Sequence, residues 1–227
     1  MIVYGRNAVK EALRGRRRLT TVWVDRNAAH EPWLRGAPVE QTDPHRLEEL
    51  CGSPDHQGVC ADAGDYPYAD PRSLLRADDA LVVVLDEVQD PRNLGAVCRV
   101  AECAGAAGVV IPERRAAHVT PVVCKTSAGA VEHLPIARVR NVADWLADAK
   151  AAGAWVYGAD AQGDDYAGFD YKGRVVLTLG AEGRGLRPRV AKACDALVAL
   201  PIRGHVGSLN VSAAAAALVY GILQSSR

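Results

Sequence analysis

The stretch that decides the fold is VVLTLGAEGRGL, residues 175–186, in which an unbroken apolar run ends in a glycine-rich turn. A run without polar alternation indicates a strand covered on both faces, as in a parallel sheet. Similar runs occur elsewhere in the second half of the chain, at 81–85, 108–111, 134–139, 155–158 and 196–200. Helical patterns lie between them, at 94–104, 142–152, 188–193 and 211–224. This alternation of strand and helix predicts a parallel α/β sheet.

The first 64 residues carry a smaller α/β pattern of their own. It predicts a helix over 8–14 capped by Asn7, a strand over 20–24, a helix over 44–51 capped by Asp43, and a strand over 58–63. A segment rich in turn-forming residues, 64–71, comes next. We therefore predict a domain over 1–64, a linker over 65–78 and a second domain over 79–227.

Composition limits the classes of protein to consider. Lys plus Arg and Asp plus Glu both number 27 in 227 residues, so the chain is neutral overall. Residues 1–30 nevertheless hold seven basic side chains against two acidic ones, and such a local excess attracts phosphates. Taken alone, such a run is more often a solvated helix end. Both interpretations stay open at this point.

The cysteines and the apolar segments indicate a cytoplasmic protein without metal. Six cysteines occur, none in a Cys-x-x-Cys pair and none with histidine at zinc-finger spacing. No signal-peptide pattern and no membrane-spanning apolar run is present. We expect reduced thiols, most of them buried.

Polar side chains follow three of the predicted strands. Asn93 follows the first, with Arg99 in the helix after it; Glu182 follows another; Ser208 and Asn210 precede the last helix. The carboxyl ends of parallel strands are where open α/β sheets bind ligands, so a composite site is expected there. Each residue also has an ordinary explanation: helix capping for the amides and the serine, and an ion pair with Glu102 for Arg99.

The glycine order at 180, 183 and 185 argues against a dinucleotide site. It reads Gly-x-x-Gly-x-Gly, whereas the dinucleotide fingerprint reads Gly-x-Gly-x-x-Gly. Glu182 lies inside the turn and would repel a pyrophosphate, and the Lys-Ser/Thr of a phosphate-binding loop is missing. A nucleoside is therefore favoured over phosphates, and a nicotinamide-dependent enzyme is disfavoured.

Taken together, the three motifs resemble the SpoU, or TrmH-like, branch of the SPOUT RNA methyltransferases. The resemblance covers residues 79–227 and includes the stretch 125–130. The first domain, with Tyr4-Gly5-Arg6-Asn7 and His56-Gln57-Gly58-Val59, is similar to the accessory domain of bacterial large-subunit rRNA guanosine 2′-O-methyltransferases, which is related to kink-turn-binding ribosomal proteins. The resemblance implies a C-terminal α/β domain with a deep trefoil knot, S-adenosylmethionine as cofactor, and a homodimer.

The resemblance also implies roles for individual residues. The cofactor would be contacted by Gly180, Leu200, Ile202 and Leu209, and the catalytic set would be Arg99, Asn93, Glu182, Ser208 and Asn210. Ile202 stands where the family usually has methionine, a change of similar volume. Arg99 would act as a base or as a cationic anchor, and the anchor is favoured because an arginine holds its proton strongly. The basic run adds Arg6, Arg16, Arg17 and Arg18 as RNA-binding candidates.

The expected activity is 2′-O-methylation of RNA, with a guanosine of 23S (large-subunit) ribosomal RNA as the first choice of substrate. The alternatives are a tRNA ribose methyltransferase, an antibiotic-resistance rRNA methyltransferase, and an inert RNA-binding or ribosome-assembly module. A pure binding module has no reason to retain the whole polar set.

Overall fold

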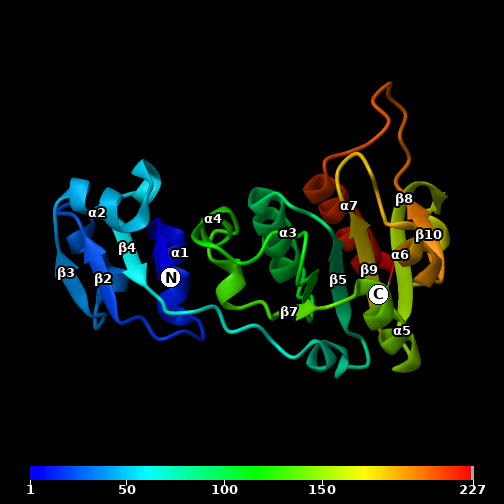
Figure 1. Cartoon of the computed structure of the whole chain (residues 1–227), viewed down its shortest axis with the longest axis horizontal. Coiled ribbons are helices and arrows are strands. Elements are labelled where there is room, and N and C mark those ends of the chain that lie inside the picture. The colour runs from blue at the N-terminus through cyan, green and yellow to red at the C-terminus, as the bar shows by residue number, and fades with distance from the viewer. Residues whose placement is uncertain (226–227) are drawn as a thin grey trace. The chain divides into compact units, whose positions relative to one another are not determined.

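The structure, a computed structural model, describes residues 1–225 (Figure 1). The chain divides into two compact units. The first comprises Met1–Pro67 and Val119–His133, and the second comprises Tyr68–His118 and Leu134–Arg227. Each unit contains its own sheet.

The first unit is built on a four-stranded sheet in the order β1-β4-β2-β3. Its elements are β1 (Ile2–Tyr4), α1 (Arg6–Arg14), β2 (Thr21–Val24), β3 (Val39–Gln41), α2 (Pro44–Cys51) and β4 (Val59–Asp62), with short 3-10 helices at Ala28–His30, Pro32–Leu34 and Pro54–His56. Asp43 caps α2 as predicted, because its carboxylate accepts from the backbone N–H of Arg46. The predicted cap at Asn7 is wrong: α1 begins earlier, after Gly5, whose φ of 92° favours glycine.

The segment Val119–His133 packs with the first unit although it lies between two strands of the second sheet in the sequence. It contains α4 (Pro121–Thr126) and a 3-10 helix at Ala130–Glu132, which contact β1 and α1. Arg17 and Glu132 form a buried ion pair, with side chains only 3% and 1% exposed. The domain boundaries predicted from the sequence did not separate this segment from its surroundings.

The second unit confirms the predicted parallel α/β fold. Its six strands run in the order β10-β8-β9-β5-β6-β7, and every neighbouring pair is parallel. The strands are β5 (Leu81–Asp86), β6 (Gly108–Pro112), β7 (Ile136–Val139), β8 (Trp155–Asp165), β9 (Val175–Gly180) and β10 (Ala196–Ala199). The helices are α3 (Pro91–Cys103), α5 (Val142–Ala151), α6 (Pro188–Ala193) and α7 (Val211–Ser225), with 3-10 helices at Pro71–Leu75 and Tyr166–Gly168.

The two central strands, β5 and β9, bring their carboxyl ends together, with Asp86 opposite Gly180. The loops after β9, β5 and β10 therefore emerge at one edge of the sheet. Residues 201–210, which we call the arm, form an exposed segment that projects beyond the sheet before α7 begins (Figure 1). The trefoil knot itself stays a prediction.

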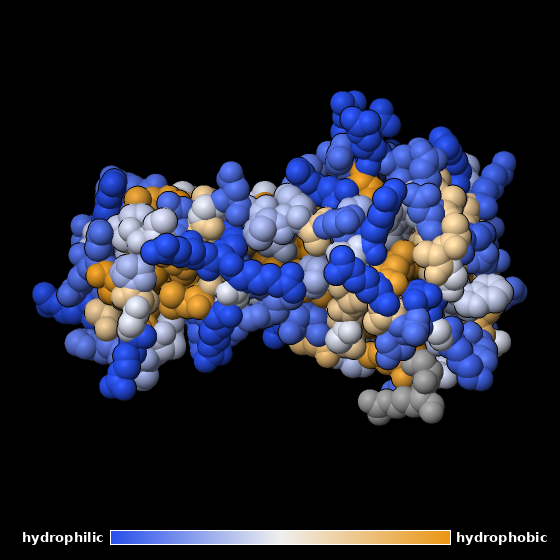
Figure 2. Space-filling model, turned by 90° about the horizontal axis from the view of Figure 1, so that it is seen from below, coloured by the Kyte–Doolittle hydropathy of each residue, from blue (hydrophilic) through white to orange (hydrophobic). Residues whose placement is uncertain are grey.

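Hydrophilic residues cover most of the surface visible in Figure 2. Within residues 1–225, no helix combines the length and the apolar character needed to cross a membrane. The six cysteines are all free thiols. Burial raises the pKa of Cys60, Cys124 and Cys194 to about 12, so these thiols stay protonated at neutral pH.

Candidate active site

A cavity of about 600 Å³ opens at the carboxyl edge of the second sheet. Three stretches line it: residues 159–162 from β8, residues 179–185 at the end of β9, and residues from β10 through the arm into the first turns of α7. Its size suits a small organic ligand. Most of the lining is small or apolar, so backbone groups are accessible from the cavity.

A hydrogen-bonded network joins the three predicted loops. The amide nitrogen of Asn93 donates to Glu182 Oε1 over 2.9 Å. Asn210 Nδ2 donates both to the same oxygen, over 2.5 Å, and to Asn93 Oδ1, over 3.1 Å. Asn210 Oδ1 in turn accepts from the backbone N–H and the hydroxyl of Ser212. These contacts fix the carboxylate of Glu182 through one oxygen.

Local backbone structure explains why these side chains are available. Asp90 caps α3 by accepting from the backbone N–H of Arg92, so Asn93 is not needed as a cap. The loop after β9 closes on itself, since the N–H of Gly185 donates to the carbonyl of Ala181 over 2.9 Å. A Cβ on Gly180 would lie 2.0 Å from the backbone of Gly185. Only glycine fits there, so Gly180 has a packing role in addition to its place in the cavity wall.

An ion pair between a buried aspartate and a half-exposed arginine supports the same loops. Asp86 is fully buried, and it accepts from the backbone N–H and the guanidinium of Arg187 over 3.0 and 2.8 Å. The hydrogen bond to Asp86 outweighs burial and raises the pKa of Arg187. Glu87, beside it, also contacts Arg187 and has a φ of 59°, which is uncommon for a residue other than glycine. The end of β5 and the start of α6 are therefore tied together.

The structure brings most of the predicted site residues together. Gly180, Leu200, Ile202 and Leu209 all line the cavity, as do Glu182, Ser208 and Asn210. Asn93 is buried behind Glu182. Ser208 lines the wall without joining the network described above, and Ser212 joins it instead through Asn210.

Arg99 lies apart from the network. Its side chain is exposed on α3 and, within residues 1–225, makes neither a hydrogen bond nor an ion pair, so the predicted pairing with Glu102 is not formed. Asn93 and Arg99 are six residues apart, about 120° around the helix, so one is buried while the other faces outward. Arg99 therefore presents an uncompensated positive charge on the outer face of α3.

The structure corrects one RNA-binding prediction and qualifies another. Arg17 is buried against Glu132 and Cys124, so its guanidinium cannot contact a phosphate in this conformation. Arg6 is exposed, but it pairs with Glu31 over 2.9 Å. Arg16 and Arg18 remain exposed, and Arg16 donates to the backbone carbonyl of His133.

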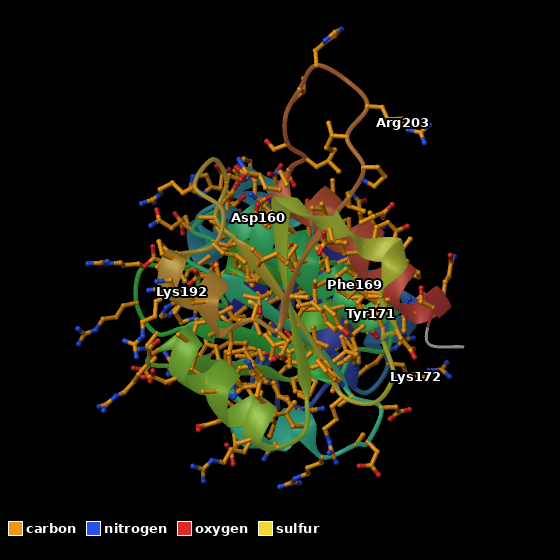
Figure 3. The ribbon with its side chains drawn as sticks, turned by 90° about the vertical axis from the view of Figure 1, so that its right-hand side faces the viewer. Asp160, Phe169, Tyr171, Lys172, Lys192 and Arg203 are labelled. Atoms are coloured by element: carbon orange, nitrogen blue, oxygen red, sulfur yellow. The ribbon has the colours of Figure 1, made fainter. Side chains whose placement is uncertain are left out.

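Sequence reasoning missed Asp160, which lines the cavity. Pairing of β8 with β10 jumps from Gly158 to Asp164, so residues 159–163 bulge out of the ladder toward the cavity. Asp160 Oδ1 accepts from the backbone N–H of Gln162, and Figure 3 places Asp160 below the arm that carries Arg203. The Gly163-Asp164-Asp165 stretch after an apolar run was the available signal for such an interruption.

The charges of the cavity suit a cationic nucleoside. Asp160 and Glu182 are acidic and Arg184 is basic, so the described lining carries one excess negative charge. S-adenosylmethionine carries an adenosine, a positive sulfonium and an amino-acid group, and its net charge is complementary. Small residues and free backbone groups suit the adenosine, so the residues present fit this cofactor. Among residues 1–225, no cluster of three or more His, Cys, Asp or Glu is placed to hold a metal ion.

Two family models match the chain. The SpoU rRNA methylase family matches residues 80–220. A model described as RNA 2′-O ribose methyltransferase substrate binding matches residues 2–69. The two matches together cover nearly the whole chain.

Similar proteins extend over the same length. YacO of Bacillus subtilis, named as a TrmH family tRNA/rRNA methyltransferase, is 37% identical over 97% of this chain and 94% of its own. A tRNA/rRNA methyltransferase of Mycolicibacterium vanbaalenii is 38% identical over 100% of this chain and 77% of its own. Among solved structures, the SpoU methyltransferase AviRb of Streptomyces viridochromogenes, in complex with AdoMet, matches with a TM-score of 0.85 and 29% identity over 100% of this chain and 91% of its own. An AdoMet-bound rRNA methyltransferase of Sinorhizobium meliloti matches with a TM-score of 0.82 and 27% identity over 98% of this chain and 86% of its own.

Proposed function

Because the chain belongs to the SpoU rRNA methylase family, we propose that it transfers a methyl group from S-adenosylmethionine to a ribose 2′-hydroxyl of RNA. The observation that carries the proposal is the Asn93–Glu182–Asn210 network at the wall of a nucleoside-sized cavity. AviRb and the Sinorhizobium meliloti enzyme, both solved with AdoMet, support the choice of cofactor.

The cofactor supplies an electrophilic methyl group, and the protein's residues bind and orient the reactants. Gly180, Leu200, Ile202 and Leu209 form the wall that holds the nucleoside, and the acidic lining favours a cation. Asn93 and Asn210 occupy Glu182 Oε1, and within residues 1–225 no group donates to Oε2, which can accept a hydrogen bond from a ligand. Holding the methyl group and the hydroxyl at the correct distance and orientation supplies much of the rate enhancement in such a transfer.

We propose large-subunit ribosomal RNA as the substrate, with a guanosine as the modified nucleoside. The match of residues 2–69 to a substrate-binding model supports a dedicated RNA-binding unit. The Sinorhizobium meliloti neighbour is named an rRNA methyltransferase, whereas the names of the curated relatives cover both tRNA and rRNA. A tRNA ribose and an antibiotic-resistance position in rRNA are the competing substrates. A cytoplasmic location follows from such a substrate and belongs to the proposal.

Purified protein given methyl-labelled S-adenosylmethionine is expected to label unmodified large-subunit rRNA made by transcription. The label should block alkaline cleavage at one position, because a 2′-O-methyl group removes the attacking hydroxyl. The measurement is mapping of cleavage-resistant positions, with transcribed tRNA as the parallel substrate. Labelling of tRNA alone would reverse the choice of substrate. Cofactor binding without labelling of either RNA would favour the inert assembly module.

The first unit is proposed to bind RNA through the exposed arginines Arg16 and Arg18. Both follow α1, and their positive charges produce a local field that attracts phosphates. Arg17, between them, is assigned instead to the structural ion pair with Glu132.

We also propose that the protein is a homodimer that pairs through α7. Ala213, Ala217 and Tyr220 are exposed and spaced at one face of this helix, and Tyr220 is 45% exposed. An apolar helix face left in solvent is typical of an interface.

Tyr220→Glu is expected to yield a monomer, because it places a charge at the centre of the proposed interface. Light scattering coupled to size exclusion measures the mass, and Gln224→Glu, at the exposed end of the same helix, serves as the control. A wild-type protein that is monomeric at micromolar concentration would contradict the proposal.

A further inference from the structure

A second, smaller cavity of about 180 Å³ lies between the starts of α5 and α6, within the second unit. Six residues line it, and three of them are arginines: Arg140, Arg187 and Arg189. The others are Asn141, Ala143 and Val190, so none of the described lining residues is acidic or aromatic. A cavity of this size and composition suits a single phosphate group and offers no surface for stacking a base.

The three arginines differ in how far their charge is compensated. Arg187 is held by buried Asp86, so it serves mainly as structure. Arg189 pairs with Asp144 over 2.7 Å, but the two side chains are 73% and 63% exposed, and such a surface pair is weak. Arg140 is exposed and, within residues 1–225, has no ion pair. Two guanidinium groups are therefore available to an anion.

The backbone adds to this charge. Asn141 caps α5, a helix of ten residues, and both Asn141 and Ala143 line the cavity. The positive end of the helix dipole therefore lies at the cavity wall and favours a negative charge there. The arginines and the helix end act in the same direction.

The position of the cavity connects it to the candidate active site. The loop after β9 lines the larger cavity as far as Gly185 and then continues directly to Arg187 and Arg189. Both cavities thus lie at the carboxyl edge of the sheet and share one loop. Only Leu186 separates Gly185 in the wall of the first cavity from Arg187 in the wall of the second.

We propose that this cavity, the Arg140 pocket, binds a backbone phosphate of the RNA substrate near the nucleotide that is methylated. The inference rests on the proposed RNA methyltransferase function. It assigns to the methyltransferase unit a phosphate contact of its own, separate from the arginines of the first unit. Arg140 and Arg189 are the contacting side chains, and Arg187, paired with Asp86, holds the start of the helix that carries Arg189.

The test measures affinity for the rRNA transcript that the wild-type protein methylates, at several salt concentrations. The double variant Arg140→Ala with Arg189→Ala is expected to bind about tenfold more weakly, because charged hydrogen bonds to phosphate are lost. Its dependence of log affinity on log salt should be shallower by roughly 0.7–0.9, since about one phosphate is no longer neutralised. Affinity for S-adenosylmethionine, measured by calorimetry, should not change.

Two further variants separate a phosphate site from a merely damaged fold. Asp144→Asn frees Arg189 and is expected to strengthen RNA binding by a few fold, a change that damage does not produce. Arg76→Ala removes an exposed arginine before β5, at the opposite edge of the sheet, and Lys192→Ala removes an exposed cation on α6 outside the cavity (Figure 3). Both controls should bind RNA as the wild type does.

The outcomes also distinguish this inference from the proposed function. If the wild type methylates RNA and the double variant has the same RNA affinity and salt dependence as the wild type, the proposal for the Arg140 pocket is overturned. The proposed function is then unaffected. Absence of methylation by the wild type would overturn the function. Binding of inorganic phosphate at millimolar concentration that the rRNA transcript does not compete with would identify a site for free phosphate. That result would overturn the RNA assignment.

Discussion

Replacing Arg99 with alanine is expected to lower methyl transfer by about a hundredfold or more, the usual effect of removing one charged group that stabilises a transition state. Arg99 is exposed on the helix that also carries Asn93, and its charge is not compensated within the described residues. The resemblance to the family predicts that this cation holds the RNA and polarises the attacking hydroxyl. The measurement is single-turnover transfer to the rRNA transcript.

Affinity for S-adenosylmethionine should be unchanged in this variant, because Arg99 does not line the cavity. Arg92→Ala is the matched control, since Arg92 is exposed on the same helix two turns earlier. Arg99→Lys distinguishes the two roles. If Arg99 is a cationic anchor, the variant's rate is lowered by the same factor at every pH. If Arg99 is a base, the pH profile of the rate is shifted. Near-normal turnover by Arg99→Ala would show that Arg99 is an ordinary surface cation.

Replacing Arg17 with alanine is expected to lower the free energy of unfolding by about 3–5 kcal/mol, because it leaves the buried carboxylate of Glu132 without a partner. Burial lowers the pKa of Arg17, but the hydrogen bond and charge of Glu132 together outweigh it and raise that pKa, so Arg17 keeps its positive charge in the folded protein. Chemical denaturation measures the loss.

Arg18→Ala is the matched control and should change stability by less than about 0.5 kcal/mol, since Arg18 is an exposed neighbour. Replacing both partners, as Arg17→Met with Glu132→Leu, should recover most of the loss because no unpaired charge remains. A loss below 1 kcal/mol in Arg17→Ala would mean that Glu132 finds solvent or another partner.

The sequence predicts the parallel sheet and the walls of the site well for physical reasons. Continuous apolar runs such as 81–85 and 175–179 have few conformations other than strands buried on both faces, and β5 and β9 are the two central strands. Because the ends of parallel strands meet at one edge, polar residues just beyond them were expected to converge, and Asn93, Glu182 and Asn210 do so.

Other features depend on long-range contacts that a local pattern does not contain. Residues 16–18 are all arginine, so the local sequence does not distinguish them. Arg17 is nevertheless buried, because Glu132, 115 residues later, pairs with it. Asp160 reaches the cavity only because β8 breaks its pairing with β10. The strands Ile2–Tyr4 and Val39–Gln41 were missed because three residues are too short to show a period.

The segment Val119–His133 has a consequence for biosynthesis. The first unit needs this segment to complete its packing, and the segment is synthesised only after β5 and β6 of the second unit. A nascent chain ending at residue 67 holds Arg17 without its carboxylate partner, so the first unit cannot reach its full stability while the chain is that short. Domains usually fold in order from the N-terminus as they leave the ribosome. Here the N-terminal unit reaches its full stability only after residue 133 has emerged, when β5 and β6 of the later unit have already left the ribosome.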